Sequence, residues 1–443
     1  MIFCKNNRFC LLLAVLGIFG FWTVSTLGFA GDWPEFRGPG GTGIYNGKAL
    51  PMEWGPDKNV AWKIEIPGKG WSSPILWHEK LYLTTAVELP SKLDKTENST
   101  GNQSAKANRI KSDYELRVLA IDATNGKLIW NKLLFISKGA SAPNIHSKNS
   151  HASPTPVTDG EHLFVHFGHE GTAALKLQTG EIIWKKIYSY QPVHGNGGSP
   201  ILVGDKLVFS CDGGDQQFVV ALNKTTGDEV WKTARNNKNN YPFSFSTPQL
   251  IDTPSGKQII SSGSFMIAGY EPETGKEIWR STYKGWSLIQ RPVYGSGLLF
   301  YTTGYMKPIL HAIEPKGSGD ITSKIVWTNP KAVANTPSLT LVNEKLYMVS
   351  DNGMFTAMEA KTGKVIWSER LPSGGYSASP LYSDGKFWIT NETGVGVVVK
   401  VDKEFQILKK NDLKEKTFAS FVPSNGALFI RTEKHLYRFE ENQ

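Results

Sequence analysis

Cysteine is scarce in this chain of 443 residues, and its placement excludes a disulfide framework. Only Cys4, Cys10 and Cys211 are present. The first two lie in an N-terminal segment that we expect to be removed, so the mature chain would keep one thiol and form no internal disulfide. Cys211 follows a predicted strand in the segment VFSCDGG, where we expect a small buried residue and not a reactive one.

Long apolar runs are missing beyond the first 30 residues. An apolar stretch at positions 11–21 follows Lys5 and Arg8, and small residues end this segment at Ala30. This order is typical of a Sec-type signal peptide. We expect cleavage after Ala30, export to the periplasm or the cell exterior, and no transmembrane domain in the mature chain. A retained membrane anchor stays open as the alternative.

The sequence also lacks the motifs of several enzyme classes. The glycine-containing segments at 38–43 and 68–74 neither follow a strand nor open a helix, as a phosphate-binding loop requires. No Ser-His-Asp order stands out, and His162, His166 and His169 have no partner carboxylate at a metal-binding spacing. Nothing resembles a nucleic-acid module. We therefore predict no catalytic residue, no metal site and no nucleic-acid partner.

What the sequence does contain is a repeated phrase ending in tryptophan. Its clearest copies are AIDATNGKLIW (120–130), ALKLQTGEIIW (174–184), ALNKTTGDEVW (221–231), GYEPETGKEIW (269–279) and AMEAKTGKVIW (357–367). Each predicts two short strands joined by a turn whose glycine has a positive φ. These turn glycines are Gly126, Gly180, Gly227, Gly275 and Gly363. The tryptophans of the series are Trp62, Trp130, Trp184, Trp231, Trp279, Trp327 and Trp367.

A second phrase, Ser/Thr-Pro before an apolar strand, alternates with the first. It occurs at Ser73-Pro74, Ser153-Pro154, Ser199-Pro200, Thr247-Pro248, Thr336-Pro337 and Ser379-Pro380, with Arg291-Pro292 as a variant. A turn and a β-rich run follow each copy, so one repeat holds four short strands. A period of about 40–50 residues with four strands per repeat indicates a β-propeller.

Counting the repeats predicts an all-β propeller of eight blades in one domain, residues 31–443. Seven complete units run from about 71 to 412, with a polar loop insert at about 89–113 in the first. The C-terminal piece 418–440 supplies three strands, and residues 59–66 supply a lone strand that carries Trp62. We expect these two ends of the chain to build the eighth blade together, which closes the ring and removes its open edges.

The two phrases together resemble the pyrroloquinoline-quinone (PQQ) type β-propellers, which include quinoprotein dehydrogenases and BamB-like outer-membrane assembly factors. The resemblance covers nearly all of residues 33–443. Segments such as DWPEFRGPGGTG (32–43) further resemble secreted members from environmental bacteria, planctomycetes among them. The resemblance implies that each tryptophan docks on the glycine turn of an adjacent blade. We expect this role for Trp130, Trp184, Trp231, Trp279 and Trp367, and count Trp62 and Trp327 in the same structural set.

The resemblance also implies what a quinoprotein dehydrogenase would need. Its features are a vicinal Cys-Cys disulfide, a calcium ion held by Glu, Asn and Asp, and an Asp base. One cysteine remains in the mature chain and no Asp/Glu/Asn cluster is evident, so neither PQQ nor Ca²⁺ is expected. We predict a non-catalytic binding or protein-interaction scaffold. Two alternatives stay open: a PQQ-dependent alcohol or sugar dehydrogenase that would bind both, and a BamB-like assembly factor, against which the missing lipid-anchor motif stands.

A ligand site, if present, is expected at one channel mouth, which the residues just before each Ser/Thr-Pro are placed to line. These residues could hydrogen-bond a sugar or an anionic ligand: His146, Asn149, His151, His194, Asn196, Ser244, Ser246, Gln290, Arg291, Asn335, Tyr376 and Ser377. The alternative is that they bind strand-end backbone groups and channel waters. Asp212 and Asp351 follow second strands, where we expect them to cap turns.

The charge pattern gives little information about partners. The formal net charge is +9, or +7 without Lys5 and Arg8, and the basic residues are spread along the chain. A soluble surface with a slight basic excess explains this better than an acidic partner. We expect a monomer whose partner is an unidentified protein or cell-envelope polymer.

Overall fold

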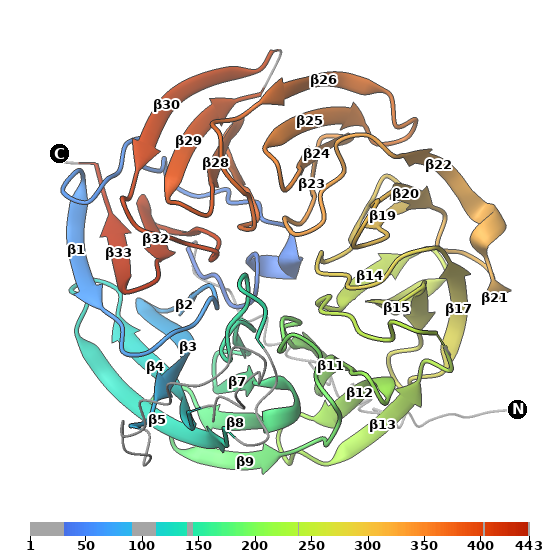
Figure 1. Cartoon of the computed structure of the whole chain (residues 1–443), viewed down its shortest axis with the longest axis horizontal. Coiled ribbons are helices and arrows are strands. Elements are labelled where there is room, and N and C mark those ends of the chain that lie inside the picture. Colours follow the sequence, from blue (N-terminus) through green and yellow to red (C-terminus); the bar gives the residue numbers. More distant parts are fainter. Residues whose placement is uncertain (1–30, 91–111, 140–144, 238, 402–403, 442–443) are drawn as a thin grey trace, which may run out of the picture.

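The chain folds as a ring of eight β-sheets around a central channel (Figure 1). The computed structural model describes residues 31–90, 112–139, 145–237, 239–401 and 404–441. The predicted signal peptide and most of the polar insert lie outside the described residues. Within them, the prediction of an all-β, eight-bladed propeller is confirmed. No helix in this described part is long and apolar enough to cross a membrane.

Each blade is a sheet whose strands are stacked in order from the channel to the rim. In blades 1 to 4 these are β2 (Ile75–Trp77), β3 (Lys80–Glu88), β4 (Tyr114–Asp122) and β5 (Leu128–Ser137); β6 (Val157–Thr158), β7 (His162–His166), β8 (Thr172–Lys176) and β9 (Ile182–Lys186); β10 (Ile201–Val203), β11 (Lys206–Asp212), β12 (Gln217–Asn223) and β13 (Glu229–Ala234); β14 (Gln249–Thr253), β15 (Gly256–Gly263), β16 (Met266–Tyr270) and β17 (Glu277–Thr282).

Blades 5 to 8 repeat the pattern. Their strands are β18 (Val293–Gly295), β19 (Leu298–Thr302), β20 (Leu310–Ile313) and β22 (Ile325–Asn329); β23 (Thr340–Val342), β24 (Lys345–Val349), β25 (Met354–Glu359) and β26 (Val365–Arg370); β27 (Leu381–Ser383), β28 (Lys386–Thr390), β29 (Val395–Lys400) and β30 (Gln406–Asp412); β31 (Val422–Ser424), β32 (Ala427–Arg431), β33 (His435–Phe439) and β1 (Val60–Glu65). The short 3-10 turns are η1 (Pro39–Gly41), η2 (Gly168–Glu170) and η3 (Thr322–Lys324).

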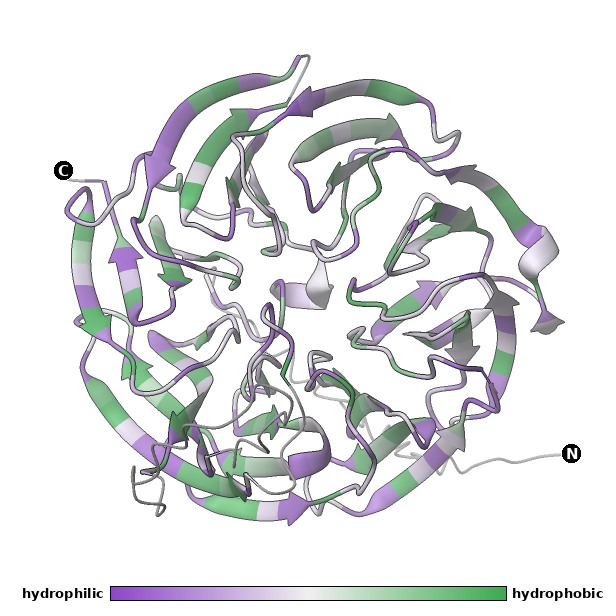
Figure 2. Ribbon diagram, in the orientation of Figure 1, coloured by the Kyte–Doolittle hydropathy of each residue, from purple (hydrophilic) through white to green (hydrophobic). Residues whose placement is uncertain are grey.

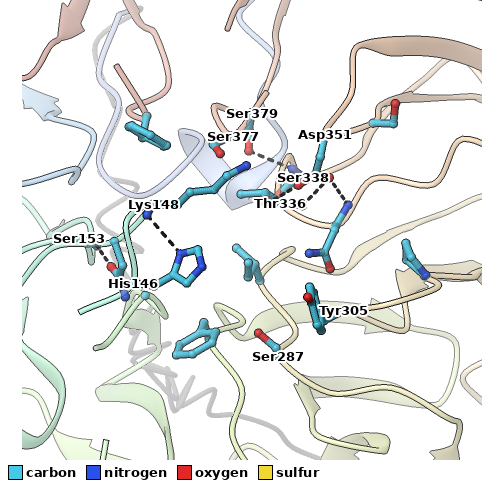
Figure 3. A pocket seen from close by; sticks show the side chains of 18 of the residues that line it. His146, Lys148, Ser153, Ser287, Tyr305, Thr336, Ser338, Asp351, Ser377 and Ser379 are labelled. Carbon is cyan, nitrogen blue, oxygen red and sulfur yellow. Dashed lines mark hydrogen bonds between the residues drawn. The ribbon is translucent and has the colours of Figure 1, made fainter. Parts of the chain in front are cut away.

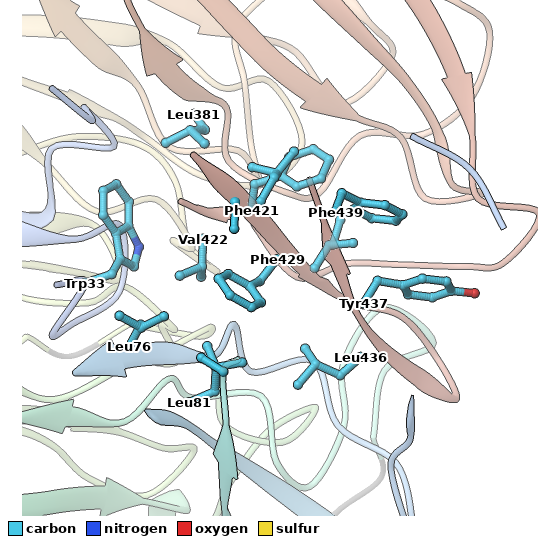
Figure 4. Close-up of a cluster of buried hydrophobic side chains, with 14 of the residues drawn as sticks. Trp33, Leu76, Leu81, Leu381, Phe421, Val422, Phe429, Leu436, Tyr437 and Phe439 are labelled. Carbon is cyan, nitrogen blue, oxygen red and sulfur yellow. The ribbon is translucent and has the colours of Figure 1, made fainter. Parts of the chain in front are cut away.

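Blade 8 closes the ring as predicted. The N-terminal strand β1 pairs antiparallel with β33, with Val60 opposite Phe439 and Glu65 opposite His435. A continuous apolar core joins this blade to its neighbours on both sides (Figure 4). It includes Leu81 of blade 1, Leu381 of blade 7 and Phe429 of blade 8. The two ends of the chain are therefore held together by buried apolar surface as well as by strand pairing.

Burial changes systematically from the channel side to the rim. Middle strands such as β12 are buried along most of their length, whereas outermost strands such as β1 alternate or are largely exposed. Figure 2 shows the matching apolar and polar alternation along the outer strands. Apolar side chains of the middle strands pack between neighbouring blades, which is where most of the core lies.

Five tryptophans of the repeat lie against a turn glycine of the next blade. A Cβ added to that glycine would lie 2.3–3.1 Å from the indole ring. All five glycines have positive φ, as predicted. Each indole Nε1 also donates a hydrogen bond to a carbonyl oxygen beside the same turn: Trp62 to Ala123 (3.0 Å), Trp130 to Gln178 (3.2 Å), Trp184 to Lys224 (2.9 Å), Trp231 to Pro272 (3.0 Å) and Trp327 to Ala360 (2.9 Å).

Trp279 and Trp367 differ from this expectation. The Nε1 of Trp279 donates to Gln258 Oε1 of its own blade at 2.8 Å, and the short strand β21 (Gly319–Asp320) pairs with β17 at Trp279. A longer segment replaces the glycine turn in blade 5, so the usual docking surface is missing there. Trp367 packs on Phe405 of blade 7 with the ring centroids 5.4 Å apart. The sequence between β29 and β30 contains no glycine.

An N-terminal segment, residues 33–45, crosses the channel and closes one end of it. We call this segment the plug; it is the dark blue chain near the centre of Figure 1. Its backbone bonds to blade 1 at Leu76, to blade 2 at Thr158 and to blade 7 at Tyr382. Apart from the turn-forming glycines, no sequence feature indicates that this segment crosses the channel.

Candidate binding site at the channel mouth

A cavity of about 910 Å³ opens at the channel end opposite the plug (Figure 3). We call it the cup. Phe36 of the plug forms its floor, because Phe36 lines the cavity while the plug bonds to the ends of the innermost strands. The walls come from the residues that precede those strands. This volume lies in the range of small-ligand pockets in proteins.

A ring of hydroxyl groups surrounds the cup just above this floor. In each step, a backbone N–H donates to the side-chain hydroxyl at the equivalent position of the next blade. The steps run from Ser73 to Thr155 (3.2 Å), Thr155 to Ser199 (2.9 Å), Ser199 to Thr247 (3.0 Å), Arg291 to Ser338 (3.1 Å), Ser338 to Ser379 (3.0 Å), Ser379 to Ser420 (3.0 Å) and Ser420 to Ser73 (3.0 Å).

The hydroxyl ring explains much of the Ser/Thr-Pro repeat. The hydroxyl residue lies directly before a proline in blades 1, 2, 3, 4 and 7, and Arg291 takes that position in blade 5. Proline has no N–H, so the preceding residue supplies the hydrogen bond to the neighbouring blade. These hydroxyl residues were predicted only to mark the start of strands and not to belong to the site. Their regular recurrence was the signal that could have identified them.

Five of the predicted mouth residues line the cup. They are His146, Asn149, His194, Asn335 and Ser377. The rings of His146 and His194 meet edge to face at 5.7 Å, and Asn149 Nδ2 donates to the His194 carbonyl at 2.8 Å. Burial and the nearby His146 lower the pKa of His194. At neutral pH the His194 ring is therefore a neutral hydrogen-bonding group and not a cation.

The other predicted residues point elsewhere. Tyr376 is buried and donates to the Pro372 carbonyl at 2.8 Å, and Gln290 donates to the Ala334 (3.0 Å) and Pro337 (2.6 Å) carbonyls. The ring of His151 stacks on Tyr114 at 4.5 Å. Asn196 packs against Gly168, and a Cβ added to this glycine would lie 2.7 Å from the asparagine Cβ.

Three further mouth residues bind backbone carbonyls. Ser244 donates to Ser262 at 3.1 Å, Ser246 to Gln290 at 2.5 Å and Arg291 to Phe36 at 2.9 Å. These three residues, like Gln290 and Tyr376, therefore hydrogen-bond backbone groups, which is the alternative stated for the predicted mouth residues.

Three charged groups at the rim, Lys148, Glu392 and Asp351, already have polar partners. Lys148 Nζ lies 2.7 Å from Glu392 Oε1, which also accepts from Ser377 Oγ at 2.7 Å. Asp351 accepts from the backbone N–H of Asn335 (2.6 Å) and from the N–H and hydroxyl of Thr336. Asp351 thus fastens the preceding loop instead of capping its own turn.

Asp212 also differs from the expected turn cap. It forms a buried bidentate pair with Arg235 inside the blade, with oxygen-to-nitrogen distances of 2.7 and 2.9 Å.

Aromatic side chains extend the cup on the side of blades 4 and 5. The ring of Trp286 stacks on Tyr241 at 4.5 Å and 14°, and on Phe265 at 6.0 Å and 19°. Tyr305 meets Trp286 at 6.1 Å, and Tyr305 and Met306 also line the cup. We call Tyr241, Phe265, Trp286, Tyr305 and Met306 the aromatic ledge. These loop residues fall outside the repeat, so sequence periodicity could not identify them.

Comparison with known proteins places this geometry in a family. A model described as "Outer membrane protein assembly factor BamB" matches residues 115–289 and 263–416, which together exceed half of the chain. Among curated proteins, the BamB protein of Shewanella oneidensis is 24% identical over 49% of this chain and 57% of its own length. The tetrathionate hydrolase of Acidithiobacillus ferrooxidans is 22% identical over 63% of this chain and 60% of its own.

A solved structure, a europium-containing methanol dehydrogenase, matches with a TM-score of 0.64 at 11% identity, covering 93% of this chain and 98% of that one. An identity this low shows the fold alone. The two curated relatives are each aligned over less than two thirds of their own length. The family model, together with the eight blades and their repeated phrases, shows that the chain belongs to the PQQ-like, BamB-like propeller family.

Proposed function

We propose that this protein is a non-catalytic binding propeller of the periplasm or cell exterior, and that it engages a protein or cell-envelope polymer through the face that carries the cup. The observation behind the proposal is the joint presence, on one face, of a cup ringed by hydroxyl groups and an exposed aromatic ledge. The predicted signal peptide and the names of the BamB relatives support a location at the cell envelope.

The ledge has the composition of an interaction surface. Tyr305 is 54% exposed, Met306 is 66% exposed and Tyr241 is 47% exposed, although all three are large side chains with substantial apolar surface. Tyrosine, tryptophan and methionine are enriched where proteins contact partners, because they bury much area at a low entropic cost. Such residues are expected to be covered when a partner binds.

The residues at the cup do not fit a PQQ and calcium site. Ca²⁺ requires six to eight oxygen ligands, but Asp351 already accepts three hydrogen bonds from its neighbours and Glu392 is paired with Lys148. Across the described ranges, no three His, Cys, Asp or Glu residues are grouped to hold a metal. Cys211 lies buried in the core between blades 2 and 3 and does not line the cup.

A matched pair of variants tests the proposal. A Tyr305→Ser, Met306→Ser double variant should lose a partner that the parent protein retains from an envelope extract of the native cells. Val326→Ser is the control, because Val326 is 51% exposed but lies on the outer strand β22. Equal retention by both variants would place the interface elsewhere.

A BamB-like role in outer-membrane assembly is the second candidate, and the family match favours it. It requires that the partner be a β-barrel insertase, so identifying the retained partner separates it from the general proposal. The dehydrogenase alternative requires that protein supplied with PQQ and Ca²⁺ reduce an artificial dye with an alcohol or sugar. Dye reduction above a blank without PQQ would overturn the non-catalytic proposal.

A further inference from the structure

Two buried arginines lie below the cup, where the plug crosses the channel. Arg37 belongs to the plug and is 3% exposed, and Arg291 replaces the ring hydroxyl of blade 5 and is 2% exposed. Each is close enough to influence the other, since Arg291 helps to lower the pKa of Arg37. A pair of like charges is thus enclosed at one point of the channel.

The protein supplies one carboxylate for these two cations. Glu35 Oε2 lies 2.8 Å from Arg291 NH2, and Arg291 NH1 donates to the Phe36 carbonyl at 2.9 Å. Arg37 NH2 donates to Thr340 Oγ1 at 2.9 Å and to the Thr42 carbonyl at 3.0 Å. These partners of Arg37 are neutral. In the described part of the chain, no carboxylate forms an ion pair with Arg37.

Three donor nitrogens of this pair have no acceptor within the part of the chain that the structure describes. They are Nε and NH1 of Arg37 and Nε of Arg291, all of them buried. A buried donor without an acceptor, and a buried charge without a counter-charge, each destabilise the folded state. Burial lowers the pKa of Arg37 only to about 9, so its guanidinium stays charged at neutral pH. Deprotonation therefore does not relieve the imbalance.

The plug backbone holds both guanidinium groups in place. A Cβ added to Gly41 would lie 2.1 Å from the guanidinium carbon of Arg291, and one added to Gly43 would lie 2.4 Å from Arg37 NH2. Both glycines have positive φ, at 68° and 71°. The glycine backbone of the plug thus packs closely against both guanidinium groups.

We propose that a small inorganic anion, of the halide class, binds at Arg37 and Arg291 and supplies the missing counter-charge. An anion accepts several hydrogen bonds at once and neutralises the excess charge, which a water molecule cannot do. The site would join the plug to blade 5 and so couple plug docking to anion binding. It does not depend on the proposed function of the cup.

Thermal unfolding of the full mature chain in chloride and in gluconate, at equal sodium concentration, tests this proposal. Gluconate is much larger than chloride, so we expect a site for a halide to exclude it. An anion that binds only the folded state raises the midpoint in a saturable manner, and we expect a rise of about 2 °C or more in chloride. Identical midpoints in both salts would overturn the proposal.

Two variants separate specific binding from general salt effects. Arg37→Gln should abolish the difference between chloride and gluconate. Arg431→Gln is the matched control, because Arg431 is also fully buried and has no carboxylate partner among the described residues. Its NH1 and NH2 donate to Ser72, Thr84 and Thr85, so only its Nε is left without an acceptor there. This control should lower the midpoint and keep the difference. A chloride effect that persists in Arg37→Gln contradicts the assignment.

A direct measurement remains decisive if Arg37→Gln does not fold. Crystals of the parent protein soaked in bromide should show an anomalous peak within hydrogen-bond distance of the Arg37 guanidinium. Water alone at that position, with no anomalous peak, would overturn the proposal.

Discussion

The indole of Trp130 in blade 1 lies directly on Gly180 of blade 2. A Cβ on Gly180 would come within 2.8 Å of the ring, and Trp130 Nε1 donates to the nearby Gln178 carbonyl at 3.2 Å. This contact fastens the outer strand of one blade to a turn of the next. Because four other blade pairs share the geometry, we expect the contact to contribute to the stability of the ring.

Substitution of glycine at two turns measures that contribution. Gly180→Ala and Gly204→Ala both place alanine at a positive φ, 65° and 62° respectively. Nothing lies within 4 Å of a Cβ at Gly204, so only the backbone cost of about 1–2 kcal/mol is expected there. Gly180→Ala should cost about 1–3 kcal/mol more, because the indole must move. Denaturant unfolding followed by fluorescence compares the two variants. Equal losses of unfolding free energy would show that the contact between Trp130 and Gly180 does not stabilise the fold.

Removing one hydroxyl of the ring between blade 1 and blade 8 should lower the stability of the protein. Ser73 Oγ accepts from the backbone N–H of Ser420 at 3.0 Å and so joins blade 1 to blade 8. Ser73→Ala leaves that buried N–H unsatisfied and should lower the free energy of unfolding by about 1–3 kcal/mol. Ser255→Ala, in an exposed turn, is the control and should change little. A neutral Ser73→Ala variant would mean that water replaces the ring hydroxyl.

Two buried histidines predict acid sensitivity. Burial lowers the pKa of His166 to about 3 and that of His311 to about 4. An unfolded chain has histidine pKa values near 6.5, so the unfolded state binds protons first as the pH falls. The stability contributed by neutral His166 is complete above about pH 6.5 and is lost progressively toward pH 3, with about 2 kcal/mol gone at pH 5.

A His166→Asn variant checks this directly. Asparagine keeps a group able to hydrogen-bond Thr172 Oγ1, which lies 2.8 Å from the histidine Nδ1, but it does not titrate. The slope of unfolding free energy between pH 7 and pH 5 should be smaller in this variant by about 2 kcal/mol over the range. An unchanged slope in His166→Asn would contradict the prediction.

The ring and its closure could be predicted from sequence because both depend on local, repeated signals. The glycine turns, the Ser/Thr-Pro dipeptides and the position of Trp62 determine four strands per blade and the pairing of β1 with β33. Trp279 departed from the pattern because a longer segment replaces the blade 5 turn and adds β21. A motif counted in isolation does not reveal such a change in the neighbouring blade.

The cup was predictable only in part. His146, His194 and Asn335 line it because they precede innermost strands, and that position could be read from the sequence. Gln290 and Arg291 precede a strand as well, but their side chains turn into the wall and the plug. The plug depends on contacts between residues far apart in the chain, such as Arg37 with Thr340. These residues lie outside the repeated phrases, so the repeat does not predict their contacts.

Photo-crosslinking in the native cells tests the central claim most directly. A benzophenone side chain is placed at Tyr305 on the aromatic ledge or at Val326 on the outer rim, positions that are 54% and 51% exposed. Because the cup face is proposed to bind the partner, a discrete crosslinked product should form from position 305 and not from position 326. Crosslinking from position 326 alone, or equally from both positions, would contradict the assignment of this face as the binding surface.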